Sequence, residues 1–297
     1  MATTIDYDAL LARFDDLVAR EIIYYAPPKT TRRNDEGFPF EFHISPSLRT
    51  KPAHIGDTSH SDGSASFEGF GPGSDIANTD PDLLITTINQ THLLVINKFS
   101  VFRPQLLLLT CDSYRRQHEP LALEDFAAIY SILRSSKKSH LVIYNCGSIA
   151  GASRNHRHVQ ILPRPAHLFL DDPNFDTEVI PFQYVLRCLR DVDFEDPDCT
   201  SKLSEIYQQL LGEAKENLKS LGTNNDGHFP HNVALVREWM IVIPRRSNNF
   251  EDITANAPGM MGSVWLKNED ELDRWKEVGP AKALAGLGFP RVSEKKG

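Results

Sequence analysis

The sequence predicts an α+β fold, in which an antiparallel β-sheet carries flanking helices. Apolar residues recur at helical spacing in two segments far apart in the chain, Tyr7–Tyr24 and Ser201–Leu221. Between them lie short apolar runs of strand length, bounded by Asn, Gly and Pro. Because these runs and the helices do not alternate regularly, the parallel sheet of a repeated βαβ protein is not expected.

The first part of the chain contains one predicted helix and one long segment without a clear pattern. An amphipathic helix is expected over Tyr7–Tyr24, with apolar positions at Leu10, Leu11, Phe14, Leu17, Val18 and Ile22. Pro27–Pro81 shows no period and is interrupted by Gly, Ser, Asp and Pro. Since irregular stretches of that length are usually functional lids or partly disordered, we expect residues 55–80 to form a flexible loop or lid.

The middle of the chain combines strand-like runs with one helix. A helix is expected at Leu121–Ser136, where apolar residues again fall on one side. The small residues of Gly147–Asn155 predict a loop. Strands are expected at Thr91–Ile96, Gln105–Thr110, His140–Asn145 and His156–Leu162.

The C-terminal part predicts an exposed loop, a helix and a hairpin. The acidic stretch Asp191–Asp198 is most simply an exposed loop. The helix Ser201–Leu221 is followed by Gly222, a residue suited to the position just past a helix. Two apolar runs, Asn232–Val236 and Trp239–Pro244, are separated by only two residues and therefore predict a β-hairpin.

Length and composition favour one soluble, reduced protein. The 297 residues can bury a large core, and we expect a single domain over 1–297 whose part 225–297 completes the sheet and the site. No apolar run approaches the roughly 18 residues that span a bilayer, and Met1–Asp8 does not resemble a secretory signal. The four scattered cysteines form no C-x-x-C pair, so we expect a cytoplasmic or nuclear protein without a membrane partner.

The net charge of −8 argues against nonspecific binding to nucleic acid, and taken alone it also makes a polyphosphate substrate a poor guess. The charge is unevenly spread, however. Asn97–His167 holds 10 Lys and Arg against 4 Asp and Glu, a net charge of +6. Asp171–Glu216 holds 4 against 12, a net charge of −8. The simplest interpretation is two solvated faces of opposite sign.

The most informative motif is H-x-H-x-Q, formed by His156, His158 and Gln160. In an extended strand these three side chains share one face, with neighbours roughly 6.6 Å apart. A neutral imidazole is available at pH 7 because its ordinary pKa is about 6.5. Such a ring can attack phosphorus and form a phosphoramidate, which divides one difficult transfer into two easier ones.

Small polar residues precede this motif and suggest an anion site. Asn145, Gly147, Ser148 and Ser153 lie in or beside a Gly/Ser loop, where backbone amides can form an anion-binding concavity. The chain has no G-x-x-x-x-G-K-[ST] sequence, so a P-loop NTPase is not supported.

Two other interpretations of the histidine pair remain open at this point. H-x-H on a strand also suits zinc, with a third ligand drawn from His92, His118, His140 or His231. Against zinc, Gln is a poor ligand and no cysteine pair is present. A purely structural role would require many hydrogen-bond partners for two buried histidines and an amide. Phosphate chemistry is the favoured interpretation.

The chain also resembles a known family, the fungal diadenosine tetraphosphate phosphorylases, or ATP adenylyltransferases, of the transferase branch of the histidine-triad superfamily. The resemblance runs from about Tyr25 to Lys267 and implies a histidine-triad, uridylyltransferase-like antiparallel sheet with flanking helices. It is carried by Tyr144–Ser148, His156–Gln160, Lys51-Pro52, Asn97–Ser100, His231-Asn232 and Met260–Trp265.

The resemblance implies a reversible transfer in two displacements. His158 would attack the α-phosphorus of diadenosine tetraphosphate, releasing ATP and leaving an adenylyl-histidine. Inorganic phosphate would then release ADP, and sulfate is a further possible acceptor through an ADP-sulfurylase activity. Gln160 marks transfer rather than hydrolysis, and His156 would orient the site.

The same resemblance suggests the substrate-binding residues. Lys51 would contact the polyphosphate, Asn97 and Lys98 the nucleoside, and Lys267 the phosphates from the C-terminal segment. Asn145, Gly147, Ser148 and Ser153 would line the phosphate cradle.

The chain departs from the family in two ways. Asn155 stands where relatives commonly have Pro before the first motif histidine. The absence of a C-x-x-C pair puts the structural metal of related uridylyltransferases in doubt, so no protein-bound metal is expected. We expect magnesium to arrive with the nucleotide, and no tightly bound cofactor. The alternatives are a nucleotide hydrolase of the same fold and a non-catalytic nucleotide-binding protein.

Overall fold

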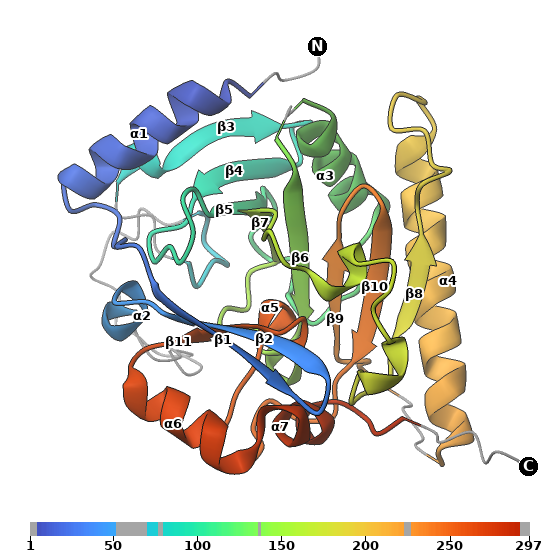
Figure 1. Ribbon diagram of the computed structural model, residues 1–297. Coiled ribbons are helices and arrows are strands. Elements are labelled where there is room, and N and C mark those ends of the chain that lie inside the picture. The colour runs from blue at the N-terminus through green and yellow to red at the C-terminus, as the bar shows by residue number, and fades with distance from the viewer. Residues whose placement is uncertain (1–4, 52–69, 77–79, 136–137, 223–226, 292–297) are drawn as a thin grey trace, which may run out of the picture.

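The computed structural model describes residues 5–51, 70–76, 80–135, 138–222 and 227–291 (Figure 1). Most of the predicted 55–80 loop or lid therefore lies outside the described residues. Only its part 70–76 is described, together with residue 80. Within the described residues the chain folds around two β-sheets, which Figure 1 shows with helices on their outer sides.

The larger sheet has eight strands, and every neighbouring pair in it is antiparallel. This confirms the predicted α+β class. The spatial order of the strands is β3-β4-β5-β7-β6-β9-β10-β8. Their bounds are Leu84–Ile88 (β3), His92–Ile96 (β4), Leu106–Thr110 (β5), His140–Cys146 (β6), His158–Pro163 (β7), Val185–Cys188 (β8), His231–Leu235 (β9) and Trp239–Pro244 (β10).

The smaller sheet corrects the prediction for Pro27–Pro81, which is not irregular throughout. Lys29–Asp35 (β1) and Phe38–Ile44 (β2) form an antiparallel hairpin, and Ser263–Leu266 (β11) adds to β2 in parallel. Phe38, Phe40 and Phe42 alternate along β2 and are all buried. That two-residue period was present in the sequence, but the surrounding Gly, Ser and Pro obscured it.

The hairpin turns at Glu36-Gly37, where both residues have positive φ, at 51° and 85°. This is the combination that a type I′ turn requires between antiparallel strands. Asn34 Oδ1 accepts a hydrogen bond from the Gly37 amide at 3.0 Å and closes the turn.

Seven α-helices occur within the described residues, and they include the three predicted from apolar spacing. The first is shorter than predicted because Glu21 has a φ of 58°, which the helix cannot contain. The 22-residue α4 is followed by Gly222 with a φ of 76°, as predicted. The bounds are Tyr7–Ala19 (α1), Ser47–Thr50 (α2), Leu123–Ser135 (α3), Cys199–Ser220 (α4), Ala257–Met260 (α5), Glu269–Val278 (α6) and Pro280–Leu287 (α7).

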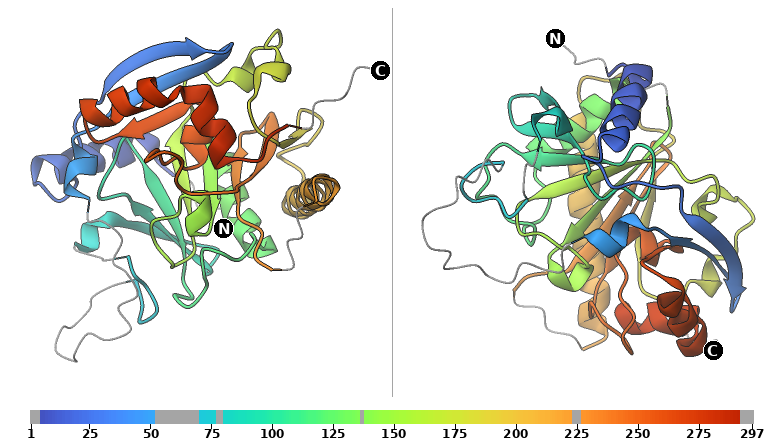
Figure 2. Two further views of the ribbon diagram at one scale, coloured as in Figure 1. Left: turned by 90° about the horizontal axis from the view of Figure 1, so that it is seen from below. Right: turned by 90° about the vertical axis from the view of Figure 1, so that its left-hand side faces the viewer.

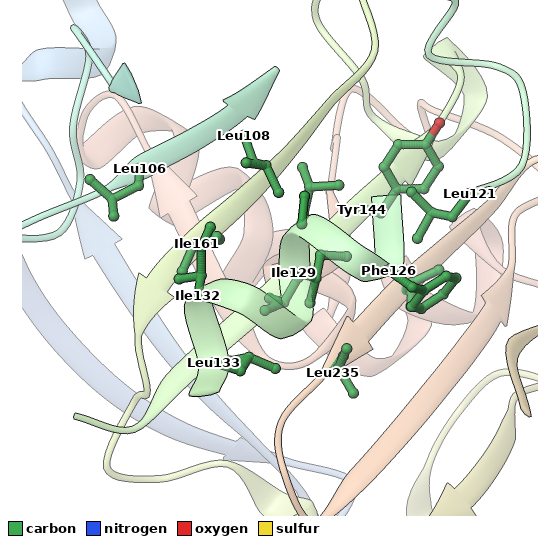
Figure 3. Packing of buried hydrophobic residues seen from close by; sticks show 14 of the residues in the cluster. Leu106, Leu108, Leu121, Phe126, Ile129, Ile132, Leu133, Tyr144, Ile161 and Leu235 are labelled. Carbon is green, nitrogen blue, oxygen red and sulfur yellow. The ribbon is translucent and has the colours of Figure 1, made fainter. Parts of the chain in front are cut away.

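The larger sheet is buried on both faces in its central strands. Val142 and Tyr144 of β6 face the cluster that contains α1, α3 and α4 residues. Their neighbours Leu141 and Ile143 face the cluster formed with the smaller sheet, α5, α6 and α7. In Figure 2 the smaller sheet with α6 and α7 lies apart from α4. Figure 3 shows α3 residues packed on the larger sheet.

Two smaller predictions are confirmed. β9 and β10 form the expected hairpin, and Val236 donates its amide to the carbonyl of Trp239. Asp191–Asp198 forms turns, and its acidic residues lie at or near the surface. Within the described residues, no helix combines the length and apolar character needed to cross a membrane.

Candidate active site

A cavity of about 330 Å³ lies at one end of the larger sheet, on the face that also packs against the smaller sheet. Its walls come from β4, β5, β6 and β7, from the loop before β7, and from segments around α2 and α5. The polar and charged residues that line it are Lys51, Asp75, Asn97, Lys98, Gln105, Asn145, Ser153, Arg154, His158, Gln160 and Asn256.

His158 is held in one tautomer by its own strand. Its Nδ1 lies 2.8 Å from the carbonyl oxygen of His156, and a carbonyl only accepts, so Nδ1 carries the proton. The lone pair is then on Nε2, the ring nitrogen left for a group in the cavity. Burial, first of all, lowers the pKa of His158 to about 4, and the charge of Lys51 adds to this. The imidazole is therefore neutral at pH 7 and able to act as a nucleophile.

Gln117 fixes the backbone of His158. Its Oε1 accepts from the His158 amide at 2.7 Å. Its Nε2 donates to the carbonyls of His158 and Asn145, both at 3.0 Å. Regular β6–β7 pairing stops at Ile143 and Gln160, so the Gln117 side chain satisfies the backbone groups that the separating strands leave unpaired.

The Gln160 amide is oriented by Gln105, a buried residue that immediately precedes β5. Val101 donates its backbone amide to Gln105 Oε1 at 2.8 Å, which turns the Gln105 NH₂ group toward Gln160. Gln105 Nε2 then donates to Gln160 Oε1, also at 2.8 Å. Because its oxygen is occupied, Gln160 has its NH₂ group left as a donor in the cavity.

His156 does not join His158 in the cavity, although both belong to the motif. Regular strand structure begins only at His158, and His156 forms an isolated bridge with Arg116. Its Nε2 donates to the carbonyl of Thr110 at 2.9 Å, and its Nδ1 meets the Ser74 hydroxyl at 2.8 Å. Both ring nitrogens are thus engaged, and the carbonyl of His156 orients His158.

Lys51 lies at the end of α2 and brings a positive charge to the cavity. Burial is the main cause that lowers the pKa of Lys51 to about 8, with further contributions from the charges of Arg154 and Lys267. Lys51 is therefore mostly charged at pH 7. A bound anion would strengthen that charge, because an opposite charge nearby raises the pKa of an ammonium group.

Asn145 presents a donor to the cavity. Its Oδ1 accepts from Asn232 Nδ2 at 2.9 Å and from the Ala257 amide at 2.8 Å. With the oxygen occupied twice, the NH₂ group is the part of the side chain that remains for an acceptor in the cavity.

The Gly/Ser loop contributes less than predicted. Four backbone amides of the loop already donate to carbonyls within the protein, so they are not available to an anion. The pairs are Gly147 to Gln117, Ala150 to Gly147, Gly151 to Ser148 and Ala152 to Gly147. Gly147 and Ser148 are not among the described residues that line the cavity, whereas Gly151, Ser153 and Arg154 are. The polar wall is thus formed by the second half of the loop.

The remaining predicted residues divide between the cavity and its surroundings. Asn97 and Lys98 line the cavity, and the Lys98 ammonium lies 5.5 Å from the ring centre of Tyr24. Lys267 does not line the cavity, although its charge is near enough to lower the pKa of Lys51. Its ammonium lies 4.0 Å from Glu271 at the surface.

Sequence reasoning missed several residues of the site. Asp75 and Arg154 line the cavity, and Gln105 and Gln117 orient its side chains. Arg154 lies in the predicted Gly147–Asn155 loop, two positions before His156, and was the one most open to prediction. The other three are distant in sequence, and only the fold brings them to the motif.

The four histidines proposed as a third zinc ligand lie outside the cavity lining. His92 contacts Asp125, His231 contacts Tyr207 and the Phe229 carbonyl, His140 packs on Tyr7, and His118 packs on His228. Within the described residues, no three His, Cys, Asp or Glu side chains come together as a metal site would require.

Two family models match the chain. The model described as the Ap4A phosphorylase N-terminal domain matches residues 23–185, more than half of the chain. The model described as the ATP adenylyltransferase C-terminal domain matches residues 178–290. The two matched segments overlap at residues 178–185, and the larger sheet takes strands from both of them.

Relatives and solved structures agree with these matches. The chain is 26% identical to diadenosine 5′,5‴-P1,P4-tetraphosphate phosphorylase 2 of Saccharomyces cerevisiae over 295 residues, covering 85% of this chain and 84% of the relative. Protein APA1 of the same yeast is 28% identical over 236 residues, covering 70% and 72%.

Among solved structures, yeast Ap4A phosphorylase Apa2 superimposes with a TM-score of 0.77 at 20% identity, covering 100% of this chain and 98% of that one. Apa2 in complex with Ap4A gives a TM-score of 0.75 at 21% identity, covering 99% and 100%. These likenesses show a shared fold. Together with the match over residues 23–185, they show that the chain belongs to the Ap4A phosphorylase family.

Proposed function

We propose that this protein catalyses the phosphorolysis of diadenosine tetraphosphate (Ap4A) to ATP and ADP, through an adenylyl group carried on His158. The observation that carries the proposal is the state of that ring. Its Nδ1 is held by the His156 carbonyl, and its Nε2 is left for a cavity lined by Lys51, Gln160 and Asn145. This supplies a neutral nucleophile beside donors suited to phosphate oxygens.

In the first step, His158 Nε2 attacks the α-phosphorus of Ap4A and the bond from that phosphorus to its bridging oxygen breaks. ATP leaves with the electron pair of that bond. The ring, now bonded to phosphorus at Nε2 and protonated at Nδ1, carries a positive charge. The carbonyl of His156, 2.8 Å from Nδ1, stabilises this charge.

In the second step, an oxygen of inorganic phosphate attacks the same phosphorus and the N–P bond breaks. ADP forms, and His158 returns to its neutral state. The NH₂ groups of Gln160 and Asn145 can stabilise the phosphoryl oxygens in both steps, and neither amide acts as an acid. The same geometry serves the reverse reaction, in which ADP adenylylates His158 and releases phosphate, and a γ-phosphate oxygen of ATP then attacks the adenylyl phosphorus to form Ap4A and free His158.

Further expectations belong to this proposal. Magnesium arrives with the polyphosphate as part of the substrate. Sulfate can replace phosphate as acceptor, since both are tetrahedral oxyanions. We propose a single domain, supported by the continuous eight-stranded sheet, in a cytoplasmic or nuclear protein whose four cysteines are all free.

The proposal is tested by product analysis with Ap4A and magnesium, with and without phosphate. We expect ATP and ADP in equal amounts only when phosphate is present, and incorporation of labelled phosphate into ADP. AMP and ATP formed at equal rates without phosphate would indicate a hydrolase instead. Binding of Ap4A without either reaction would indicate a nucleotide-binding protein.

A further inference from the structure

A buried cation without a carboxylate partner lies behind the cavity. Arg245 directly follows β10, and only 2% of its surface is exposed to solvent. Within the described residues its guanidinium forms no ion pair, and its hydrogen bonds go to neutral oxygens. The acceptors are Asn232 Oδ1 at 2.7 Å and the carbonyls of Ala255 at 2.8 Å, Ser247 at 2.9 Å, Leu287 at 3.3 Å and Ala150 at 3.4 Å.

The other fully buried arginine of the described residues is different. Arg157 is also 2% exposed, but it pairs with Asp125 at 3.0 Å and Glu119 at 2.6 Å. Burying a charge is costly unless an opposite charge compensates it. Burial lowers the pKa of Arg245 to about 9, which leaves it charged at pH 7. The fold therefore maintains a buried positive charge at this place without a carboxylate partner, held by carbonyl and amide oxygens that include the C-terminal carbonyl of α7.

Three of the hydrogen bonds lead directly to the cavity wall. Two of them go to the carbonyls of Ala150 and Ala255. The residues that follow these two in the chain, Gly151 and Asn256, line the cavity. The third bond goes to Asn232, whose Nδ2 donates to Asn145 Oδ1 at 2.9 Å. Arg245 thus holds three separate parts of the wall from behind.

The bond to Asn232 also helps to orient Asn145, together with the Ala257 amide, which donates to the same Asn145 Oδ1 at 2.8 Å. A guanidinium has only donors, so it forces the oxygen of the Asn232 amide toward itself. The Asn232 NH₂ group must then face Asn145 and the carbonyl of Ala150. Consequently Asn145 accepts through its oxygen and has its NH₂ group left for the cavity, the end that suits an anion.

We propose that Arg245 is a positioning residue for polyphosphate binding: it orients Asn145 through Asn232, and its charge is compensated by the anion on the other side of the wall. The inference rests on the proposed function only in that the cavity receives a nucleotide polyphosphate. It does not depend on turnover.

The test compares the affinity for ATP with that for adenosine, which has no phosphate. Isothermal titration of wild type and Arg245→Met, both with magnesium, should show ATP binding weakened about tenfold or more and adenosine binding changed less than twofold. Arg245→Lys, which keeps the charge but not the fork of donors, should fall between them. Equal losses for both ligands, or no loss for ATP, would overturn the proposal.

Two further variants keep this test decisive. Asn232→Asp conserves the shape of the core, gives Arg245 a negative partner and turns acceptors toward Asn145. It should therefore lower the ATP-to-adenosine preference as Arg245→Met does, even if the latter folds poorly. Arg157→Met also removes a buried guanidinium, but away from the cavity, and should destabilise the protein while preserving the preference. An unchanged preference in Asn232→Asp would contradict the inference.

The outcome is separable from that of the proposed function. If wild type fails to phosphorolyse Ap4A but its preference for ATP depends on Arg245, the inference stands and the reaction is wrong. If phosphorolysis proceeds and the preference does not depend on Arg245, the reverse holds.

Discussion

Gln105 Nε2 donates to Gln160 Oε1 at 2.8 Å, and this contact decides which end of the Gln160 amide faces the cavity. The orientation originates one step further back, because the Val101 amide occupies Gln105 Oε1. A Gln at the third motif position thus becomes a dedicated donor. This fixed orientation supports the role proposed for Gln160, that of a neutral donor to the phosphoryl oxygens.

Gln105→Glu should reverse that orientation. A carboxylate at this position accepts from the Val101 amide and from the Gln160 NH₂ group, so Gln160 would present its oxygen to the phosphoryl group. We expect kcat to fall about 10²-fold, the effect of losing one fixed donor to a developing charge. The measurement is steady-state phosphorolysis, with Gln105→Met as the control that removes the contact without imposing the reversal. A kcat for Gln105→Glu at or above that of Gln105→Met would refute the orientation argument.

The pH dependence of kcat/KM should have limbs from two groups of the free enzyme. His158 must be neutral to attack, and its pKa of about 4 means that activity declines only as the pH falls toward 4. Lys51 must be charged to bind the anion, so KM should rise as the pH passes about 8. An acidic limb near 6.5, the ordinary imidazole value, would show that His158 is not buried as described.

Lys51→Arg tests the second limb on its own. Arginine stays charged throughout the accessible range, so the rise in KM near pH 8 should disappear in this variant. The acidic limb should stay in place, since His158 is unchanged. Retention of the alkaline rise in Lys51→Arg would assign that limb to another group.

Asn155→Pro tests the departure from the family pattern. The amide of Asn155 donates to Asp75 Oδ2 at 2.6 Å, and that of His156 donates to Oδ1 at 2.9 Å. Proline has no amide hydrogen, so one of the two bonds to the carboxylate is lost. We expect the free energy of unfolding to fall by about 1–2 kcal/mol, measured by urea denaturation. Asn155→Ala keeps the amide and should be nearly neutral; an equal loss in both variants would assign the effect to the side chain.

Strand alternation predicted much of the site, and its failures have physical causes. His158 and Gln160 share the face toward the cavity, as their two-residue spacing predicts. His156 does not, because regular strand structure starts only at His158. Periodicity does not show where a strand begins. Here the backbone and ring of His156, just before β7, are held by hydrogen bonds to Ser74, Asp75 and Thr110 from elsewhere in the chain.

Long-range polar contacts account for the rest. Nothing in the sequence near Gln105 or Arg245 distinguishes them from ordinary polar residues. They act through Gln160 and Asn232, which the fold brings from 55 and 13 positions away. Net charge was similarly uninformative about the ligand, since the cavity collects Lys51, Lys98 and Arg154 within a chain of charge −8.

The central claim is that His158 carries the adenylyl group. It is tested most directly by mixing enzyme with Ap4A and magnesium in the absence of phosphate, then measuring intact mass after rapid quenching at neutral or alkaline pH. We predict the addition of one adenylyl group per chain, mapped to the peptide that contains His158, with one equivalent of ATP released. The adduct should be acid-labile, absent from His158→Ala and converted to ADP when phosphate is added. An adduct that persists in His158→Ala, or phosphorolysis by this variant at the wild-type rate, would contradict the account.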